Sequence, residues 1–245
     1  MSNTRKISIM KEGGALLGKI RERLLVDVKP GISTLELDRM AEAYITNAGG
    51  KPSFKMVDGY NWTTCICVND CIVHGIPDKY ALQSGDCVTV DIGMFYDGYH
   101  TDTASTIIVG QPNGEHFLDV GKDALKQAIA QAKVGNHIGH ISLAMQQNIE
   151  GAGFNVARNL VGHGVGRELH MDPQVPCYLD QKLEKTPKLE DGLTIAIEAI
   201  YMEGGKSLVV DNDGWSMRTK DGKRAGMFEH TVAITTSGPV ILTNA

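Results

Sequence analysis

Two stretches of the chain repeat the same pattern of apolar and polar positions. Lys29-Pro-Gly31 leads into an amphipathic stretch that stops at Ala48-Gly49, and Lys133-Val-Gly135 leads into one that stops at Ala152-Gly153. The second pattern follows the first at an offset of 104 residues. Each stretch predicts a helix, a glycine-containing turn, a second amphipathic helix and a glycine stop.

Runs of β-branched and aromatic residues that are typical of strands follow each helix pair. These runs are Thr64–Asn69, Asp86–Tyr96 and Tyr99–Val109 in the first half, and Leu193–Met202, Gly214–Thr219 and Phe228–Thr235 in the second. Two such halves predict an α+β fold with internal pseudo-symmetry and one shared, mostly antiparallel sheet flanked by helix pairs. Because no linker or low-complexity segment divides the chain, we expect residues 1–245 to form a single catalytic domain.

Composition narrows the class of protein. Hydrophobic residues make up 42% of the chain and charged residues 22%, which is ordinary for a globular protein with a sizeable core. The formal net charge is −5, and no long basic run indicates nucleic acid as a substrate. No apolar run approaches the roughly 20 residues of a membrane span, so we expect a cytoplasmic protein without a membrane partner.

The five cysteines are odd in number and include no CxxC pair, which favours free thiols in a reducing compartment. Cys65, Cys67 and Cys71 are close enough in sequence to suggest a soft metal site. Their spacing lacks the usual zinc pattern, so buried small hydrophobic side chains are the preferred interpretation.

The first candidate chemistry lies in a predicted hairpin. Asp97-Gly98 separates two apolar, β-branched runs, a strong signal for a two-residue turn. With that turn, Gly93 faces Asp102, and Asp91 is a diagonal neighbour of Asp102 on the same face, roughly 7–8 Å away. A bulge would shift this pairing by one residue. Two carboxylates that converge from apolar strands are costly without a cation between them, although two solvated strand carboxylates remain the alternative.

The second half supplies two more acids in apolar strand-like runs. Glu198 closes one run and Glu229 opens another. Taken singly, each glutamate is better explained by a salt bridge, since a buried glutamate is usually paired. Four such acids together indicate a metal site.

Histidines complete the candidate set. His163 lies in the run Gly162-His-Gly-Val-Gly166, where glycines allow close approach of the backbone. His170 follows seven residues later, but the glycines argue against a helix that would place both rings on one face. Asp91, Asp102, His163, Glu198 and Glu229 would suit two divalent ions of manganese, iron, cobalt or zinc, and hence amide hydrolysis.

The ordered set of motifs resembles the methionine aminopeptidases, a group of the pita-bread metallopeptidases. The matching segments are His74-Gly-Ile-Pro77, Val90-Asp91-Ile-Gly93, Thr101-Asp102-Thr103, Gly162 to Arg167 with His170, Ile197-Glu198, and Phe228-Glu229-His230-Thr231. The likeness extends over nearly the whole chain. It implies a pita-bread fold and removal of methionine from nascent polypeptides whose second residue is small.

The resemblance also implies a role for each matched residue. Asp91 would hold one ion, Asp102 and Glu229 would bridge both, and His163 and Glu198 would complete the shell of the other. Glu198 would also carry a proton from the attacking water to the leaving amine. His170 and His74 would contact the peptide at the scissile bond. The residues that would line the methionine pocket are Tyr60, Cys65 and Trp215.

Two positions depart from the family pattern. Met171 replaces a common glutamate after His170, and Ala199 replaces a common proline after Glu198. Neither position holds metal in the family, so they affect the expected geometry rather than the catalytic groups. Too few residues separate His170 from Glu198 for the helical insertion of the longer subtype, which favours the short bacterial form, type I.

Two rival functions are open at this point. A proline-specific peptidase of the same fold usually carries an aspartate after the last glutamate, whereas this chain has His230. A binding protein that kept the fold and lost catalysis would usually lack metal ligands, and all five are present. For the aminopeptidase, we expect as partners the N-termini of nascent polypeptides close to the ribosome, and a monomer in solution.

Overall fold

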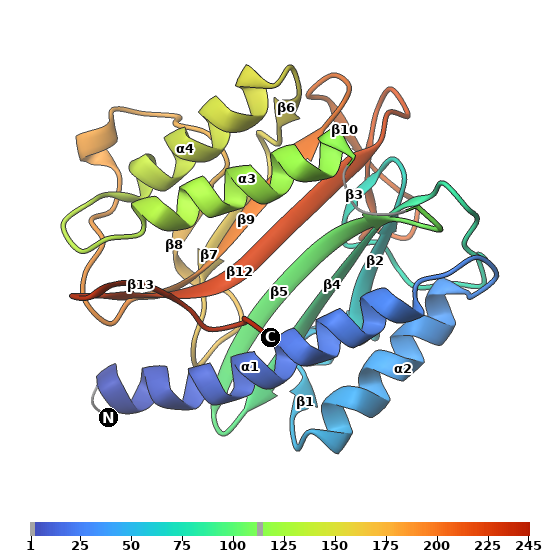
Figure 1. Ribbon diagram of the computed structural model, residues 1–245, viewed down its shortest axis with the longest axis horizontal. Helices are drawn as coiled ribbons and strands as arrows, with labels where there is room; N and C mark the ends of the chain where they lie inside the picture. The colour runs from blue at the N-terminus through green and yellow to red at the C-terminus, as the bar shows by residue number, and fades with distance from the viewer. Residues whose placement is uncertain (1–2, 112–114) are drawn as a thin grey trace.

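A computed structural model describes residues 3–111 and 115–245. Four α-helices pack against antiparallel strands (Figure 1). The helices are α1 (Asn3–Asp27), α2 (Thr34–Asn47), α3 (His116–Gln131) and α4 (Ile138–Gly151). The strands and short 3-10 helices are β1 (Lys51–Pro52), η1 (Phe54–Met56), β2 (Thr64–Val68), β3 (Cys71–Val73), β4 (Cys87–Tyr96), β5 (Tyr99–Ile108), β6 (Asn155–Val156), β7 (Val161–Gly164), β8 (Met171–Pro176), η2 (Leu183–Lys185), β9 (Thr194–Met202), β10 (Leu208–Val210), β11 (Met217–Thr219), β12 (Ala225–Thr235) and β13 (Gly238–Ile241).

The predicted internal repeat is confirmed. Both bounds of α4 lie 104 residues after those of α2. Gly31 and Gly135, which enter these helices, have φ of +93° and +91°, a left-handed conformation that glycine adopts without a steric penalty. The glycine stops, Gly49 and Gly153, have φ of +82° and +88°. The glycines are therefore required by backbone conformation on both sides of each helix.

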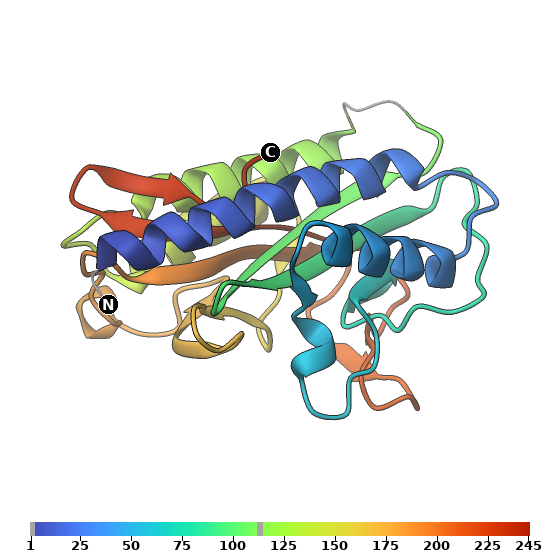
Figure 2. The same ribbon diagram turned by 90° about the horizontal axis from the view of Figure 1, so that it is seen from below.

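Each helix pair covers the strands of its own half. Apolar residues of α1 and α2 form one core with β2, β4 and β5, while those of α3 and α4 form another with β9 and β12. Side chains alternate along the strands, so Val90 and Ile92 of β4 enter the first core while Asp91 faces the other way. Figure 2 shows α1 and α3 on one side of the strands and the loops that carry η1 and η2 on the other.

The expectation of one shared sheet needs a correction. The described strands form sheets of four, three and six strands, and no backbone ladder joins β5 to β12 among them, although the two strands lie side by side (Figure 1). Threonine hydroxyls replace the ladder. Thr103 donates to the carbonyl of Glu229 at 2.8 Å, and Thr231 donates to that of Asp102 at 2.9 Å. The halves are thus joined by side chains at the two residues expected to bridge the metals.

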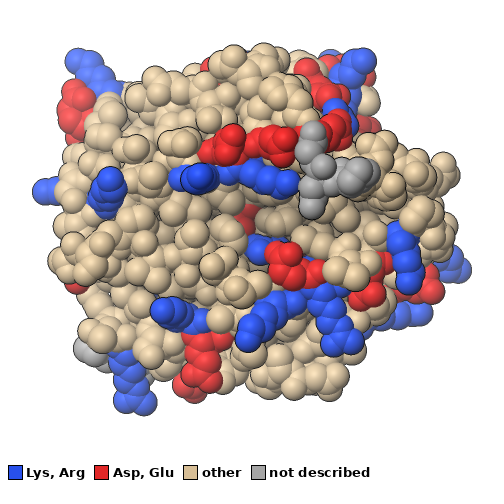
Figure 3. Space-filling model, viewed as in Figure 1, with Lys and Arg blue, Asp and Glu red and all other residues tan. Residues whose placement is uncertain are grey.

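Most predicted strands are found within one or two residues of their expected ends. The run Gly214–Thr219 is shorter than predicted, and β11 begins at Met217. The residues before it form a turn, in which the backbones of Trp215 and Ser216 both donate to Oδ1 of Asp213 at 2.8 Å. Of the described helices, none is long and apolar enough to cross a membrane. Lysines, arginines and acids are interspersed on the face seen in Figure 3 rather than gathered by sign.

Candidate metal centre

All ten residues expected at the site line one cavity of about 680 Å³. They are Tyr60, Cys65, His74, Asp91, Asp102, His163, His170, Glu198, Trp215 and Glu229. They come from both halves of the chain, and the strands of the two halves place the acids at the seam between β5 and β12. The cavity is therefore formed by tertiary packing rather than by any one segment.

The hairpin geometry expected from Asp97-Gly98 is confirmed. Gly93 pairs with Asp102 and Asp91 with Ala104, so the two aspartates are diagonal neighbours on β4 and β5. Asp97 and Gly98 both have positive φ, as a two-residue turn of this kind requires. The alternation of the strands then directs both carboxylates into the cavity.

The two glutamates are direct cross-strand partners, whereas the two aspartates are diagonal neighbours. Glu229 on β12 pairs directly with Glu198 on β9, and both side chains line the cavity. Their backbone positions are thus cross-strand partners, where like charges are unfavourable. A pair of this kind indicates that a cation or protons must be held between them.

His163, on β7, lines the same cavity as the four acids. Its Nδ1 lies 2.9 Å from the carbonyl oxygen of Gly164, which can only accept, so Nδ1 carries the hydrogen. Nε2 is left with its lone pair and lies 3.5 Å from Oε1 of Glu198. A backbone carbonyl that fixes the tautomer in this way is common behind metal-binding histidines.

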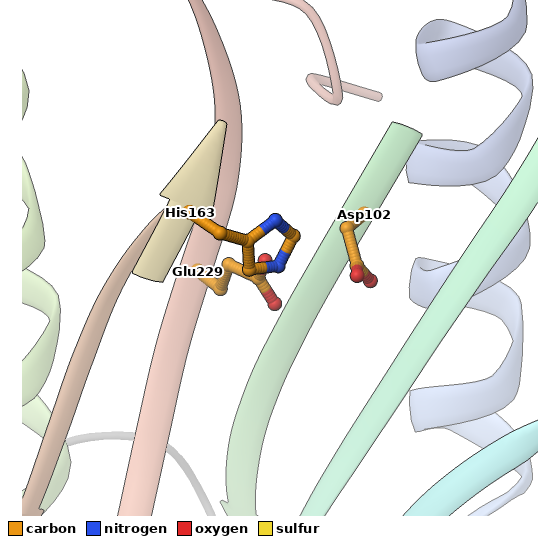
Figure 4. A group of neighbouring side chains, drawn as sticks. All are labelled: Asp102, His163 and Glu229. Carbon is orange, nitrogen blue, oxygen red and sulfur yellow. The ribbon is translucent and has the colours of Figure 1, made fainter. Parts of the chain in front are cut away.

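Three side chains meet tightly enough to share one ion. One ligand atom from each of Asp102, His163 and Glu229 lies within 4.8 Å of the others, and Figure 4 shows the three side chains turned toward one another from separate strands. Oδ1 of Asp91 and Oε1 of Glu229 are buried without a hydrogen-bond partner. Buried oxygens without partners are costly, and a hard divalent cation would satisfy both.

The charges of the site reflect this crowding. Burial raises the pKa of Asp91, Glu198 and Glu229 well above the usual range, and neighbouring carboxylates raise it further. Burial also raises the pKa of Asp102 to about 7. For His163, burial lowers the pKa to about 4, so the imidazole is neutral and able to bind metal. The donor set of oxygens and one imidazole therefore fits divalent ions.

The other two histidines lie beside this group. The ring of His170 is 4.5 Å from that of His163, centre to centre, because the chain turns between β7 and β8 instead of forming a helix. His74 has φ of +57°, a conformation uncommon outside glycine, and its ring is 6.4 Å from Trp215. Burial lowers the pKa of both His74 and His170, which favours neutral rings at this wall of the cavity.

An apolar corner adjoins the carboxylates. Tyr60 packs edge-on to Trp215 with ring centres 5.1 Å apart, and its hydroxyl donates to the carbonyl of Thr64 at 2.8 Å. Cys65 pairs across the sheet with Asp91, which places its thiol next to the acids. Phe54 and Leu169 complete the same cluster, although the sequence had indicated neither of them as part of the site. Leu169 stands beside His170 in the motif, a signal that could have found it.

The remaining cysteines take no part in this site. All five are buried and free, and Cys67 accepts a hydrogen bond from the backbone of Gly75 at 3.3 Å. Among the described residues, the only metal-binding group is the cluster of Asp102, His163 and Glu229. The thiols of Cys67 and Cys71 interact with each other, but with Cys65 they do not form a three-ligand group. Buried small hydrophobic side chains remain the better interpretation of Cys67 and Cys71.

Comparison with known proteins gives a consistent family. The model of metallopeptidase family M24 matches residues 8–236. Methionine aminopeptidase 1 of Bacillus subtilis is 41% identical over 241 residues, which cover 98% of this chain and 96% of that protein. The crystal structure of methionine aminopeptidase from Thermotoga maritima matches with a TM-score of 0.94 and 38% identity, covering 98% of this chain and 97% of that one.

A more distant likeness concerns the fold alone. Prolidase from Pyrococcus furiosus matches with a TM-score of 0.76 and 24% identity, and this chain covers 64% of it. The pita-bread architecture expected from the sequence is confirmed by these structures.

Proposed function

The chain belongs to the methionine aminopeptidases of metallopeptidase family M24, and we propose that Asp91, Asp102, His163, Glu198 and Glu229 hold its two divalent ions. The observation that carries this proposal is the convergence of the five side chains in one cavity with buried, unpartnered oxygens on Asp91 and Glu229. We also propose that residues 1–245 act as one catalytic domain, because each half supplies ligands and neither holds the set alone.

Bound ions of manganese, cobalt, iron or zinc would supply Lewis acidity and a more acidic water at this site. Glu198 takes a proton from the attacking water and delivers it to the leaving amine. A carboxylate suits this role, because it can accept a proton in one step and release it in the next. His163 stays neutral, with its Nδ1 hydrogen held by Gly164.

The neutral histidines act on the peptide rather than on the metals. His170, beside His163, donates a hydrogen bond to the scissile carbonyl, where negative charge develops. His74 contacts the peptide from its position next to Trp215. Both rings line the cavity from loops outside the acid cluster, so they can reach a substrate without displacing a ligand.

The apolar corner selects the substrate's first residue. Tyr60, Cys65 and Trp215 receive the methionine side chain, since aromatic rings and a thiol suit an unbranched thioether. A long second residue would collide with the walls beside the acids, so small second residues are accepted. The substrates are N-termini of newly made polypeptides in the cytoplasm, near the ribosome, and the enzyme works as a monomer.

The test is reconstitution of metal-stripped protein. Manganese, cobalt or iron should each restore release of methionine from Met-Ala-Ser, while Leu-Ala-Ser and Met-Lys-Ser should be poor substrates. A proline-specific enzyme would instead cleave Ala-Pro and leave Met-Ala-Ser intact. Full activity without metal would overturn the metal centre, and equal cleavage of Met-Lys-Ser would overturn the selectivity.

A further inference from the structure

One buried acid is not used by the function proposed above. Asp38 lies on α2 and is 5% exposed. Burial raises its pKa, and hydrogen bonds from Thr64 and Thr63 oppose that rise. A buried carboxylate destabilises a fold unless hydrogen bonds compensate for its lost hydration. The groups that donate to Asp38 therefore indicate what this acid holds in place.

Three donors converge on one oxygen of Asp38. Its Oδ1 accepts from the backbone N–H of Thr63, the backbone N–H of Thr64 and the hydroxyl of Thr64, each at 2.9 Å. An oxygen that accepts three hydrogen bonds carries no proton, which favours the carboxylate form. Charge-assisted hydrogen bonds are roughly twice as strong as neutral ones. Asp38 thus fixes two consecutive residues that lie 25 and 26 positions further along the chain.

Thr64 connects this anchor to the proposed methionine pocket. Its carbonyl accepts the hydroxyl of Tyr60 at 2.8 Å, and Cys65 follows it directly on β2. Tyr60 and Cys65 line the cavity of the metal centre, whereas Asp38 and Thr64 do not. Thr64 is fully buried, and its N–H, hydroxyl and carbonyl are all engaged. One residue therefore links Asp38 to two side chains of the pocket.

The segment that carries Tyr60 has little regular structure of its own. Residues 57–63 lie between η1 and β2, outside the helices and strands, on the side of the strands opposite α1 and α3 (Figure 2). Asp58, Gly59 and Asn61 are exposed, whereas Tyr60 is buried. Exposed loops open more readily than strands, because they make fewer buried contacts. The hydrogen bonds to Asp38 at the end of this loop limit how far Tyr60 can move relative to Cys65.

From these contacts we propose that Asp38 is a positioning residue that determines specificity for methionine, because it sets the spacing of Tyr60 and Cys65 through Thr64. The inference rests on the proposed function, which assigns the methionine side chain to these two residues and Trp215. Apolar pockets distinguish side chains that differ by one methylene by only about 10–200-fold. A pocket whose walls move apart accepts branched side chains that the native spacing excludes, so a small displacement lowers this discrimination.

The first experiment replaces Asp38 by its amide. An amide oxygen has two lone pairs and no full charge, so Asp38→Asn keeps the shape of the side chain but cannot hold three donors. The ratio of kcat/KM for Met-Ala-Ser to kcat/KM for Leu-Ala-Ser, the Met/Leu ratio, should fall about 10-fold. The fall should come mainly from a higher KM for Met-Ala-Ser, while kcat and metal content change less than about 2-fold.

Asp86→Asn is the matched control. Asp86 is also buried, and its carboxylate accepts hydrogen bonds from Asn69 at 2.9 Å, Tyr80 at 3.1 Å and Gln83 at 2.8 Å. None of these partners lines the cavity of the metal centre. Asp86→Asn should therefore lower the free energy of unfolding to a similar extent and leave the Met/Leu ratio unchanged. A fall of the same size in both variants would show that lost stability, and not the position of the pocket walls, changes the ratio.

A second measurement does not require Asp38→Asn to fold. Thr64→Val removes the hydroxyl that donates to Asp38 and keeps the shape of the side chain, whereas Thr64→Ser keeps the hydroxyl. Thr64→Val should lower the Met/Leu ratio about 3-fold, as expected for one lost hydrogen bond, and Thr64→Ser should stay near wild type. Combined with Asp38→Asn, Thr64→Val should add less than its separate effect, because both changes remove the same bond.

An unchanged Met/Leu ratio in folded Asp38→Asn or in Thr64→Val would overturn the inference, and so would equal losses in Thr64→Val and Thr64→Ser. Wild-type protein that fails to release methionine from Met-Ala-Ser with metal present, or that cleaves Leu-Ala-Ser equally well, would instead overturn the proposed function. The two failures are therefore distinguishable.

Discussion

The first half of the molecule, from α1 to β5, and the second, from α3 to β12, follow the same plan of helix pair and paired strands, yet they bring different acids to the site. In the first half, the tight turn at Asp97-Gly98 sets Asp91 and Asp102 diagonally across adjacent strands. In the second half, Glu198 and Glu229 are direct cross-strand partners on strands joined by a long connection. The longer glutamate side chains face each other from paired positions, whereas the shorter aspartates are staggered.

This difference has a consequence for the proposed chemistry. Glu198 has a longer side chain than an aspartate and stands on the half that also supplies His163 and His170. The first half supplies Asp91 together with the apolar corner of Tyr60 and Cys65. In the proposed function, proton transfer therefore belongs to the second half, whereas the methionine pocket takes Tyr60 and Cys65 from the first half and Trp215 from the second.

The largest expected effect comes from the glutamate pair. Glu198→Gln should lower kcat by roughly 10²–10⁴-fold, because an amide cannot carry the proton and binds metal less well. Steady-state hydrolysis of Met-Ala-Ser and circular dichroism would measure activity and fold together. Glu184→Gln, the same change outside the site, should be silent. A near-normal kcat in Glu198→Gln would show that another group moves the proton.

Substitutions of the neighbouring histidines His163 and His170 should have different effects on metal content and on kcat. His170→Ala should lower kcat by about 10²–10³-fold with metal content unchanged, as expected for loss of a hydrogen bond to developing charge. His163→Ala should lose metal, and excess metal should partly restore its activity. Metal analysis beside kinetics distinguishes them. Substantial metal loss in His170→Ala would place that ring among the ligands instead.

The acids of the two halves predict a pH effect in metal-free protein. The pKa of Asp102 is raised to about 7 and that of Asp91, Glu198 and Glu229 is raised further above their usual range. A raised pKa stabilises the fold while the group is protonated, and this contribution is lost as pH rises through the folded value. Metal-free protein should therefore be less stable at about pH 8 than at about pH 7. This interval lies above the usual histidine pKa of about 6.5, so proton uptake by unfolded histidines opposes the effect only weakly.

Metal should abolish that dependence by replacing the protons. Free metal at 100 times its Kd should add about 2.7 kcal/mol of stability. A fixed metal concentration should add more at the higher pH, where fewer protons compete for the carboxylates. Thermal unfolding with chelator and with manganese at both pH values provides the measurement. Stability of the metal-free protein that stays level or rises over this interval would argue against a crowded, protonated acid cluster.

The smallest effect concerns the helix caps. Ser33 accepts from the backbone of Glu36 at 3.2 Å, and Glu36 accepts from that of Ser33 at 2.9 Å. Ser33→Ala should lower the free energy of unfolding by about 1 kcal/mol without changing kcat, as judged by urea denaturation. Glu36→Gln keeps a capping group and should lie closer to wild type. Equal losses in both variants would mean that charge, not geometry, stabilises this cap.

The second half caps its helix with different groups. At the position equivalent to Ser33, the backbone of His137 donates to Nδ1 of His140 at 3.0 Å, and the backbone of Gly139 donates to the hydroxyl of Thr186 at 2.9 Å. His140 therefore takes the place of Glu36, and His140→Ala should cost about as much as Glu36→Ala if the caps are equivalent. A clear inequality would show that the halves depend on their caps to different degrees.

The sequence by itself determined the local elements of this protein. Periodicity and glycine stops predicted both helix pairs, because left-handed backbone at Gly31 and Gly135 needs glycine whatever the surroundings. The Asp97-Gly98 turn predicted the register of β4 and β5 and hence the diagonal of Asp91 and Asp102, since a two-residue turn fixes the pairing of strands that contain no bulge.

Only the tertiary structure decided what lies between distant segments. No local rule pairs Glu198 with Glu229 or brings His163 to them, because these contacts depend on how β7, β9 and β12 pack. The sequence likewise did not predict the hydrogen bonds from the hydroxyls of Thr103 and Thr231 that join β5 to β12. A hydroxyl can bond the backbone of another strand only when the two strands are already adjacent.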